Sequence, residues 1–400
     1  AEAHGAADAL LHGTAEGDTL LQLLSNVLCH QLSRQIRLPD FHDVDVDGLA
    51  DHGLNLLTEL VDLRTTLADD LAWYIEKDWS TGAQRTDAPA LEPFSYARYW
   101  HGYLIWLRPL LLLMPYTGVR IVQYIVLFAL LAVVLVQLRR RCGLRAAVWF
   151  AVSQLAVSVW FVPHQVQYFT CFMIAYAGCA WVLAKPRRSD VLCLGLLVLG
   201  TATAFCDLLV TPIITLGLPL TCWLLEPQQR LRGGVPQCAL AVGGSLCWGT
   251  GYALCWAGKW ALAGAVTNNN VLADALHQAE VRTTADTWHG MELTWRNIFS
   301  FLYDTLNSHH LFWPALAVLA VLIALFILSI RSKTALVRAL PLALTTCMTP
   351  AWFVLLRTHS IQHGWFTWRA LGLTVFAGLA FLYYACDLRA ARRRLQKGSI

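Results

Sequence analysis

The residues of this sequence best suited to chemistry are Arg, His and Asp side chains that border long apolar stretches. An ionisable group close to a hydrocarbon core is costly, so it indicates a function unless water or lipid headgroups reach it. Arg offers a planar fork of donors that suits phosphate, and His can donate to phosphate or carry a proton. Together they predict an outward cavity that binds an anionic ligand. The set comprises Arg98, His101, Arg108, Arg120, His164, Asp207, Arg357, His359, His363 and Arg369.

A second set of candidate residues is acidic and lies in the first part of the chain. Asp43, Asp45 and Asp47 reproduce the front half of an EF-hand calcium loop. The position that should hold a bidentate Glu is Leu54, which argues against calcium, and Asp47 could simply cap a helix. Asp47 and Asp51 lie one helical turn apart and could act as a general base or hold a metal. A divalent cation at these acids is the only cofactor that the sequence suggests.

The elements that position these residues are expected to be membrane helices. Of the 400 residues, 57% are hydrophobic and 14% are charged, and the mean hydropathy is +0.50. An average soluble domain is about 45–50% apolar and about 25% charged. The composition excludes a disordered chain and an ordinary cytosolic enzyme, and it predicts an all-α, polytopic transmembrane bundle. The 12 cysteines form no CxxC pair, so neither zinc nor redox chemistry is expected from them.

About nine spans are predicted from the apolar stretches, because roughly 20 helical residues cross a hydrocarbon core. The continuous run 191–225 is too long for one crossing, and it predicts two short spans that meet at Cys206 and Asp207. A single broken or re-entrant helix is the alternative. The stretches cover 119–138, 146–163, 168–184, 191–206, 208–225, 236–260, 312–330, 339–356 and 368–386.

The distribution of charge predicts the orientation of this bundle. Residues 1–102 hold 17 Asp and Glu against 6 Lys and Arg, while the rest of the chain holds 9 acids against 24 bases. Basic linkers between spans are expected in the cytoplasm. The sequence therefore predicts an acidic, helical head at 1–102 outside the plasma membrane, a bundle at 103–388 with an outer loop at 261–311, and a basic cytoplasmic tail at 389–400. A nucleic-acid partner is not expected.

The exported head has a further consequence for the expected organisation of the chain. A head of this size outside the membrane needs a signal peptide or an earlier span to carry it across. The sequence begins at Ala1 without an apolar leader. A first span before residue 1 is therefore expected, which would bring the total to about ten.

Three segments resemble uncharacterised polytopic membrane proteins of Gram-positive bacteria. They are Ser95 to Tyr103 with the following Arg108-Pro109, then Phe205 to Leu220, and His359 to Arg369. The resemblance covers about residues 45–390, and the layout is similar to that of GT-C-type glycosyltransferases. It implies many spans, a large first outer loop with a catalytic acid, and a polyprenyl-phosphate-linked sugar as donor.

On the positions of this sequence, the resemblance places the loop acid at Asp47 or Asp51 and a second outer carboxylate at Asp207. It implies that Arg side chains and a His hold the lipid phosphate and stabilise the leaving charge. Those side chains are Arg98, Arg108, Arg369 and His359, with His101, His164 and His363 as further candidates for substrate binding.

Two alternatives to an enzyme remain. A transporter or flippase of lipid-linked or anionic solutes would show inverted repeats and charges at mid-bilayer, and no repeat is visible. A non-catalytic envelope protein would use the head for interaction with membrane lipid or other partners. The enzyme hypothesis predicts that the acids, Arg98, His359 and Arg369 line one outward cavity within about 10–12 Å.

Overall fold

The computed structural model describes residues 98–387, apart from residues 208, 232–233, 268–269, 285–286, 289–290, 293, 309, 311 and 331. The predicted acidic head, with Asp43, Asp45, Asp47 and Asp51, lies outside the described residues, as does the basic tail at 389–400. The described residues all belong to one compact unit, Ala97–Ile400.

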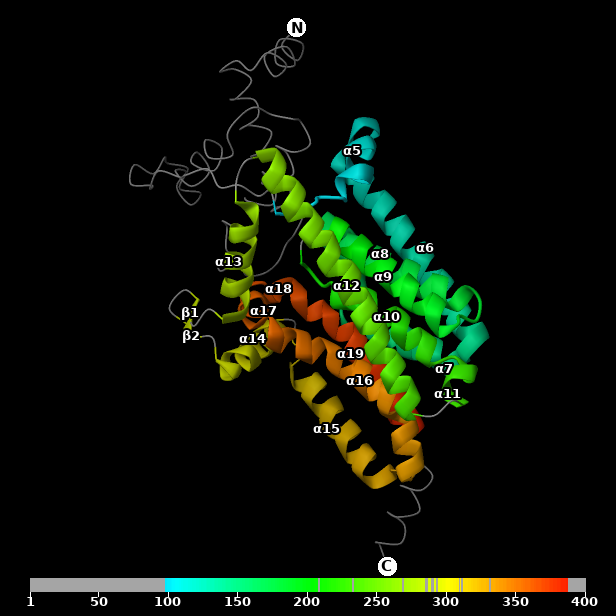
Figure 1. Ribbon diagram of the computed structural model, residues 1–400. Helices are drawn as coiled ribbons and strands as arrows, with labels where there is room; N and C mark the ends of the chain where they lie inside the picture. Colours follow the sequence, from blue (N-terminus) through cyan, green and yellow to red (C-terminus); the bar gives the residue numbers. More distant parts are fainter. Residues whose placement is uncertain are drawn as a thin grey trace, which may run out of the picture. The chain divides into compact units, whose positions relative to one another are not determined.

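This part of the chain is a bundle of helices (Figure 1), which confirms the predicted all-α class. One short antiparallel pair, β1 (Thr287–Trp288) and β2 (Met291–Glu292), lies between α13 and α14. The helices are α5 Leu104–Leu113, α6 Tyr116–Cys142, α7 Leu144–Ala156, η2 Val159–His164, α8 Val166–Ala184, α9 Ser189–Cys206, α10 Ile213–Leu224, α11 Pro227–Leu231, α12 Gly234–Thr267, α13 Val271–Thr284, α14 Trp295–Ser308, α15 Phe312–Ser329, α16 Lys333–Leu355, α17 Arg357–Gln362, α18 Gly364–Thr367, η3 Trp368–Ala370 and α19 Leu371–Ala385.

Within the described ranges, five helices are long and apolar enough to cross a membrane, as a multi-pass membrane protein requires. A bent pair, Leu302–Ser308 with Phe312–Ala324, makes six if it crosses as one span. Each of the nine predicted stretches contains a helix, but several of these helices have only 10–17 residues. The five are α6, α9, most of α12, α16, and the segment Gly364–Ala385 that runs through α18 and α19.

The short helix α10 lies at the centre of the bundle. All of its 12 residues are buried, which explains why its sequence is apolar on every side. Its length is about 18 Å, well below the roughly 30 Å of a hydrocarbon core. The run 191–225 therefore forms two helices that meet near Asp207, and the second is enclosed by protein. Only α9 is long enough to cross a membrane, so the crossing predicted for the second helix stays a prediction.

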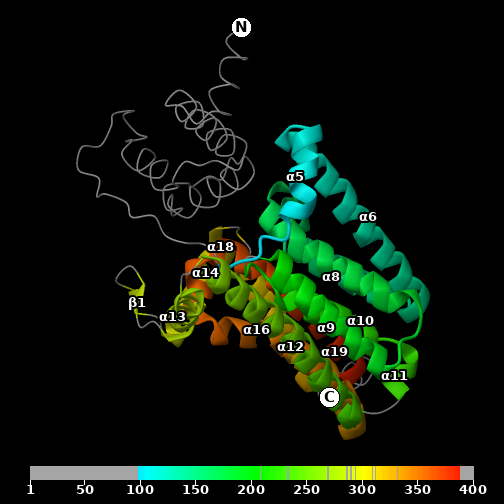
Figure 2. The ribbon, with the colours of Figure 1, turned by 45° about the horizontal axis from the view of Figure 1, so that its top comes forward.

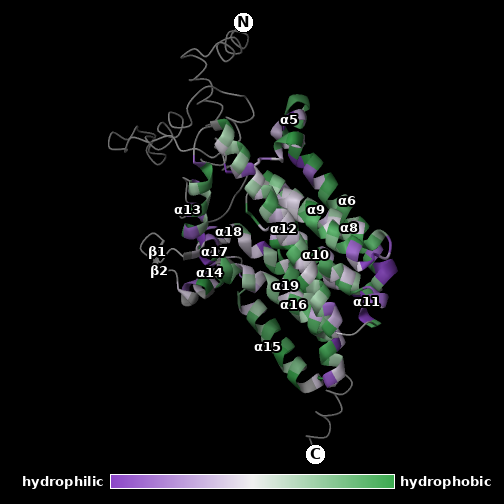
Figure 3. Cartoon of the chain, viewed as in Figure 1, coloured by the Kyte–Doolittle hydropathy of each residue, from purple (hydrophilic) through white to green (hydrophobic). Residues whose placement is uncertain are grey.

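Polar residues gather at two opposite ends of the bundle (Figure 3). One end carries the ends of α9, α12 and α16 together with α13, α17 and α18, and we call it the Asp207 end. The other, the basic end, carries α11 and the Arg-rich end of α6. The linkers that the sequence separates by charge thus lie at opposite ends, and the assignment of the basic end to the cytoplasm stays a prediction.

Small residues allow α9 and α12 to pack closely along their length, and the two helices lie side by side in both ribbon views (Figures 1 and 2). A Cβ atom on Gly200 of α9 would collide with the carbonyl oxygen of Trp248, and one on Gly251 of α12 would collide with that of Leu197. Both collisions are with backbone, which cannot turn aside as a side chain can. The two glycines therefore set the distance between the helices.

Gly200→Ala is expected to destabilise the protein by about 1–3 kcal/mol, because the added methyl group forces α9 and α12 apart. Thermal unfolding of the purified protein in detergent measures the loss. Gly249→Ala on α12 is the matched control, since no atom lies within 4 Å of a Cβ added there. The control should be neutral or gain up to about 1 kcal/mol from helix propensity. Equal effects of the two substitutions would contradict this account of the packing.

Candidate functional site

Asp207 forms the turn that joins α9 to α10. Its side chain is only 3% exposed, and its carboxylate oxygens both accept from the backbone N–H of Val210, at 3.2 and 3.0 Å. Its own N–H donates to the carbonyl of Thr203 at 2.8 Å. Within the turn, Leu209 has φ 67°, a left-handed conformation that is uncommon for a branched residue. The carboxylate is thus engaged in shaping the backbone between the two helices.

His359 lies on α17 and contacts this turn. Its Nε2 is 2.8 Å from the carbonyl oxygen of Leu209. A carbonyl can only accept, so Nε2 carries the proton and Nδ1 carries the lone pair. Burial, then His363 with its ring centroid 4.7 Å away, then Arg282, hold the pKa of His359 well below its usual value. The imidazole is therefore neutral at pH 7, and its buried Nδ1 has no hydrogen-bond partner among the described residues.

Arg369 is a buried cation within the apolar segment Gly364–Ala385. Its guanidinium donates to the carbonyl of Trp365 at 3.1 Å and lies over the rings of Tyr168 and Trp368, at 5.2 and 5.0 Å from their centroids. No carboxylate of the described residues pairs with it, and its buried Nε has no partner there. Cation–π contacts recover about 0.5–2 kcal/mol each, less than the several kcal/mol that burial of an ion costs. The arrangement indicates a site for an anion.

A single aromatic ring connects His359 with Arg369. The centroid of Phe366 is 6.2 Å from that of His359 and 5.7 Å from that of Tyr168, which lies under Arg369. Buried polar atoms without partners are rare in folded proteins and indicate a bound water, ion or ligand. Several belong to residues of α8, α17 and η3 in the described part of the chain. They are Tyr168 OH, Thr358 Oγ1, His359 Nδ1, Ser360 Oγ and Arg369 Nε.

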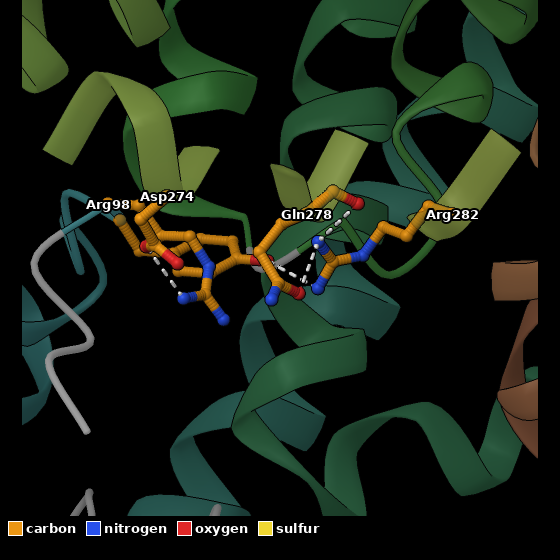
Figure 4. Close-up of polar contacts among 5 residues, drawn as sticks. Arg98, Asp274, Gln278 and Arg282 are labelled. Atoms are coloured by element: carbon orange, nitrogen blue, oxygen red, sulfur yellow. Dashed lines mark hydrogen bonds and ion pairs between the residues drawn. The ribbon is translucent and has the colours of Figure 1, made fainter. Parts of the chain in front are cut away.

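Arg98 contacts a polar face of α13 that Asp274, Gln278 and Arg282 form (Figure 4). Arg98 Nη1 is 3.1 Å from Asp274 Oδ2. Arg282 Nη1 is 3.4 Å from both the carbonyl and Oε1 of Gln278, and its Nη2 is 3.4 Å from Tyr99 OH. The three α13 residues are four positions apart and so share one face. Because Arg98 is paired with a carboxylate, Arg369 is the stronger attractant for a further anion.

Aromatic side chains form a row along α12, whose last residues lie at the Asp207 end. Trp248, Tyr252, Trp256 and Trp260 follow one another at every fourth position, with successive ring centroids 4.8, 6.2 and 5.7 Å apart. Tyr99 contacts Trp256 edge to face at 4.9 Å. Neither this aromatic row nor the Asp274, Gln278 and Arg282 face is among the site residues predicted from the sequence, although each repeats every four residues, as one face of a helix does.

His164 belongs to a different cluster, between η2 and α6. Arg120 Nε donates to the carbonyl of His164 at 3.1 Å, and Tyr124 OH is 2.7 Å from His164 Nε2. Tyr124 OH also donates to the carbonyl of Trp160 at 2.7 Å. Burial, then Arg120, lower the pKa of His164. The structure therefore uses His164 to attach η2 to α6.

The remaining predicted residues are spread more widely. His101 has φ 53°, and its Nδ1 is 3.4 Å from Tyr103 OH. The next residue, Gly102, donates its N–H to the carbonyl of Phe205 at 2.8 Å, which attaches this segment to the end of α9. Arg108 lies exposed on α5. Among the described residues no group of three or more His, Cys, Asp and Glu could hold a metal ion.

The structure thus brings Asp207, His359 and Arg369 together, with Arg98 joined to them through Tyr99 and Arg282. No protein-family model, curated protein or solved structure matches this chain. Its function therefore has to be inferred from the chemistry of these side chains.

Proposed function

We propose that this protein is a multi-pass membrane enzyme of the GT-C glycosyltransferase type, which uses a polyprenyl-phosphate-linked sugar at the outer leaflet of the plasma membrane. The observation that carries this proposal is Arg369, a buried cation for which the described residues supply no carboxylate. A lipid-linked phosphate would neutralise it through charge-assisted hydrogen bonds to the guanidinium.

The depth of Arg369 favours a lipid-linked anion over a soluble one. The residue lies about 8 Å along the helical path from Gly364, where the apolar segment begins. In the proposed membrane placement of this segment, a soluble anion would have to leave water to reach Arg369. The phosphate of a membrane lipid already lies near the interface, and its hydrocarbon tail would remain among the apolar side chains around it.

Two features of the Asp207 end support a sugar as the group that is linked to the phosphate. Thr358, Ser360 and Tyr168 present buried hydroxyls without partners, which the hydroxyls of a sugar would satisfy. The aromatic row of α12 provides apolar ring faces at the same end of the bundle. In the proposed reaction, an acceptor hydroxyl attacks the sugar and Arg369 stabilises the charge on the leaving polyprenyl phosphate.

The other residues take their roles in this proposal from the resemblance. The resemblance implies a loop acid at Asp47 or Asp51 and a second outer carboxylate at Asp207; Asp47 and Asp51 lie outside the described residues, and their role stays a prediction. The resemblance also implies substrate binding by Arg98, His101, Arg108, His164 and His363, and these roles stay predictions. A divalent cation at the head is the only cofactor that we include.

Polyprenyl phosphate is expected to bind the purified full chain in lipid nanodiscs and to raise its melting temperature, whereas the matching uncharged polyprenol should not. Arg369→Gln should abolish that effect, because the neutral amide cannot pair with phosphate. Arg338→Gln is the control, at an exposed position of α16. A stabilisation that polyprenol reproduces, or that Arg369→Gln retains, would rule out this phosphate site.

Transfer is tested in the same nanodiscs with a panel of polyprenyl-phosphate-linked sugars, by following release of polyprenyl phosphate. Release that depends on the wild-type chain supports the enzyme. Binding of the lipid with no release from any donor would instead favour the flippase alternative.

A further inference from the structure

Asp207 and His359 form one hydrogen-bonded unit, although they are far apart in the sequence. The carboxylate of Asp207 holds the N–H of Val210, and this closes a turn that directs the carbonyl of Leu209 toward α17. That carbonyl accepts from His359 Nε2 at 2.8 Å. The turn therefore determines which imidazole nitrogen bears the proton.

This tautomer limits what His359 can do. Its single proton is engaged with Leu209, so the neutral ring has no N–H to offer a phosphate. Its Nδ1 presents a buried lone pair, which would repel phosphate oxygens and attract a hydroxyl. Thr358 and Ser360, the preceding and following residues of α17, also have buried hydroxyls without partners, which project about 100° to either side of His359.

We propose that His359 Nδ1 accepts the proton of the acceptor hydroxyl during sugar transfer, and that Asp207 is a positioning residue that presents the Leu209 carbonyl to His359. This inference rests on the proposed function. It replaces the assignment that the resemblance implies, in which Asp47 or Asp51 is the base, Asp207 is a second outer carboxylate of the site and His359 holds phosphate.

In the proposed step, the acceptor oxygen forms a bond to the anomeric carbon of the sugar as the bond from that carbon to the phosphate oxygen breaks. The electron pair of the broken bond leaves with the polyprenyl phosphate, whose new charge Arg369 stabilises. The hydroxyl proton moves to Nδ1, and the imidazolium that forms remains hydrogen-bonded to Leu209 through Nε2.

The surroundings of His359 determine its pH dependence. His363, between α17 and α18, and Arg282 on α13 both disfavour a positive charge on the ring, as burial does, while the Leu209 carbonyl favours it. The net effect is a pKa well below the usual value for His, so the neutral, accepting form predominates at neutral pH. Where proton acceptance by His359 limits the rate, sugar transfer should become faster as the pH rises. The rate should reach its plateau at a pH below the ordinary pKa of His.

Four variants of the full chain in nanodiscs test the assignment. His359→Gln can still donate to the Leu209 carbonyl but has no basic lone pair, so transfer should fall about 10²–10⁴-fold while polyprenyl phosphate still binds. His359→Asn serves as a second neutral replacement and should also lose transfer. Asp207→Asn can still accept from Val210 and should keep most of the transfer. Asp207→Ala releases the turn and should lose transfer as His359→Gln does.

Nitrogen NMR of histidine-labelled protein provides a readout that does not depend on activity. The signal that is missing from the spectrum of His359→Gln is that of His359. His359 should be protonated at Nε2 in the unchanged chain and in Asp207→Asn. Its signal should change in Asp207→Ala. Protonation at Nδ1 in the unchanged chain would overturn the inference, and so would transfer retained by His359→Gln or lost in Asp207→Asn. Failure of the unchanged chain to bind polyprenyl phosphate would instead overturn the proposed function, and with it the acceptor role.

Discussion

Replacing Arg369 with Met is expected to raise the melting temperature of the ligand-free protein and, at the same time, to abolish its binding of polyprenyl phosphate. The two effects have opposite signs because the buried charge of Arg369 destabilises the ligand-free protein, whereas it attracts the phosphate of the ligand. Replacement of a buried ion by an apolar side chain of similar size is often neutral, or stabilising by about 1–4 kcal/mol. The stacking on Tyr168 and Trp368 is retained in part, since Met also packs well against rings.

The effect on binding should be the larger of the two. Removing one partner from a desolvated charge pair costs about 3–5 kcal/mol, which corresponds to at least about a hundredfold loss of affinity. Differential scanning fluorimetry, with and without polyprenyl phosphate, measures both effects on one sample. Arg338→Met, at an exposed position of α16, should change neither.

A large loss of stability in the ligand-free Arg369→Met protein would contradict this account. It would mean that Arg369 already has a partner that satisfies its charge, so that the residue is structural. The sign of the change in melting temperature therefore separates a binding site from a structural ion more directly than loss of activity does.

At the basic end, Arg141→Ala is expected to cost about 3–5 kcal/mol of stability at neutral pH. Arg141 Nη2 lies 2.8 Å from Glu226 Oε1, and the Glu226 side chain is only 2% exposed. Removing Arg141 leaves a buried carboxylate without its partner. Urea unfolding of the two proteins in the same detergent measures the difference.

The pH dependence of this loss is set by Glu226. Burial raises the pKa of its carboxyl above the usual value, and Arg141 opposes that rise. A group whose pKa is higher in the folded state contributes nothing below its unfolded pKa, where both states bind the proton. It becomes destabilising as the pH rises through the folded pKa. Acidification should therefore recover much of the stability of Arg141→Ala, and Glu226→Gln in the same chain should recover it at neutral pH.

An exposed ion pair of the same type provides the control. Arg188 Nη2 is 3.1 Å from Asp190 Oδ2, but the side chains are 85% and 64% exposed. Water screens such a pair, so Arg188→Ala should cost no more than about 1 kcal/mol. A loss at Arg141 as small as that at Arg188 would show that Glu226 finds another partner or water.

Much of the fold could be predicted from the sequence, because the transfer of apolar residues out of water depends on composition more than on contacts. Every apolar stretch contains a helix, and the run 191–225 is divided near Asp207. The number of spans was less predictable. Hydropathy does not distinguish a residue that faces lipid from one that faces protein, and α10 is apolar because it is buried on all sides.

The residues of the candidate site were predictable by type but not by partner. Arg369, His359 and Asp207 stand out in sequence because an ionisable group beside an apolar stretch is costly. Whether that cost is offset depends on which polar atom lies within about 3 Å of the ionisable group. The contacts of Arg98 with Asp274 and of His359 with Leu209 join residues that are far apart in the chain. No local pattern could show them.

By itself, the sequence determined the helical class, the separation of charge between the ends of the bundle, and the short set of ionisable residues worth testing, since each depends on composition and order along the chain. The tertiary structure decided which of those charges is compensated. It pairs Arg98, attaches His164 to α6, uses Asp207 to shape a turn and leaves Arg369 without a carboxylate among the described residues. Compensation is a matter of distances in space, and these exist only once the helices have packed.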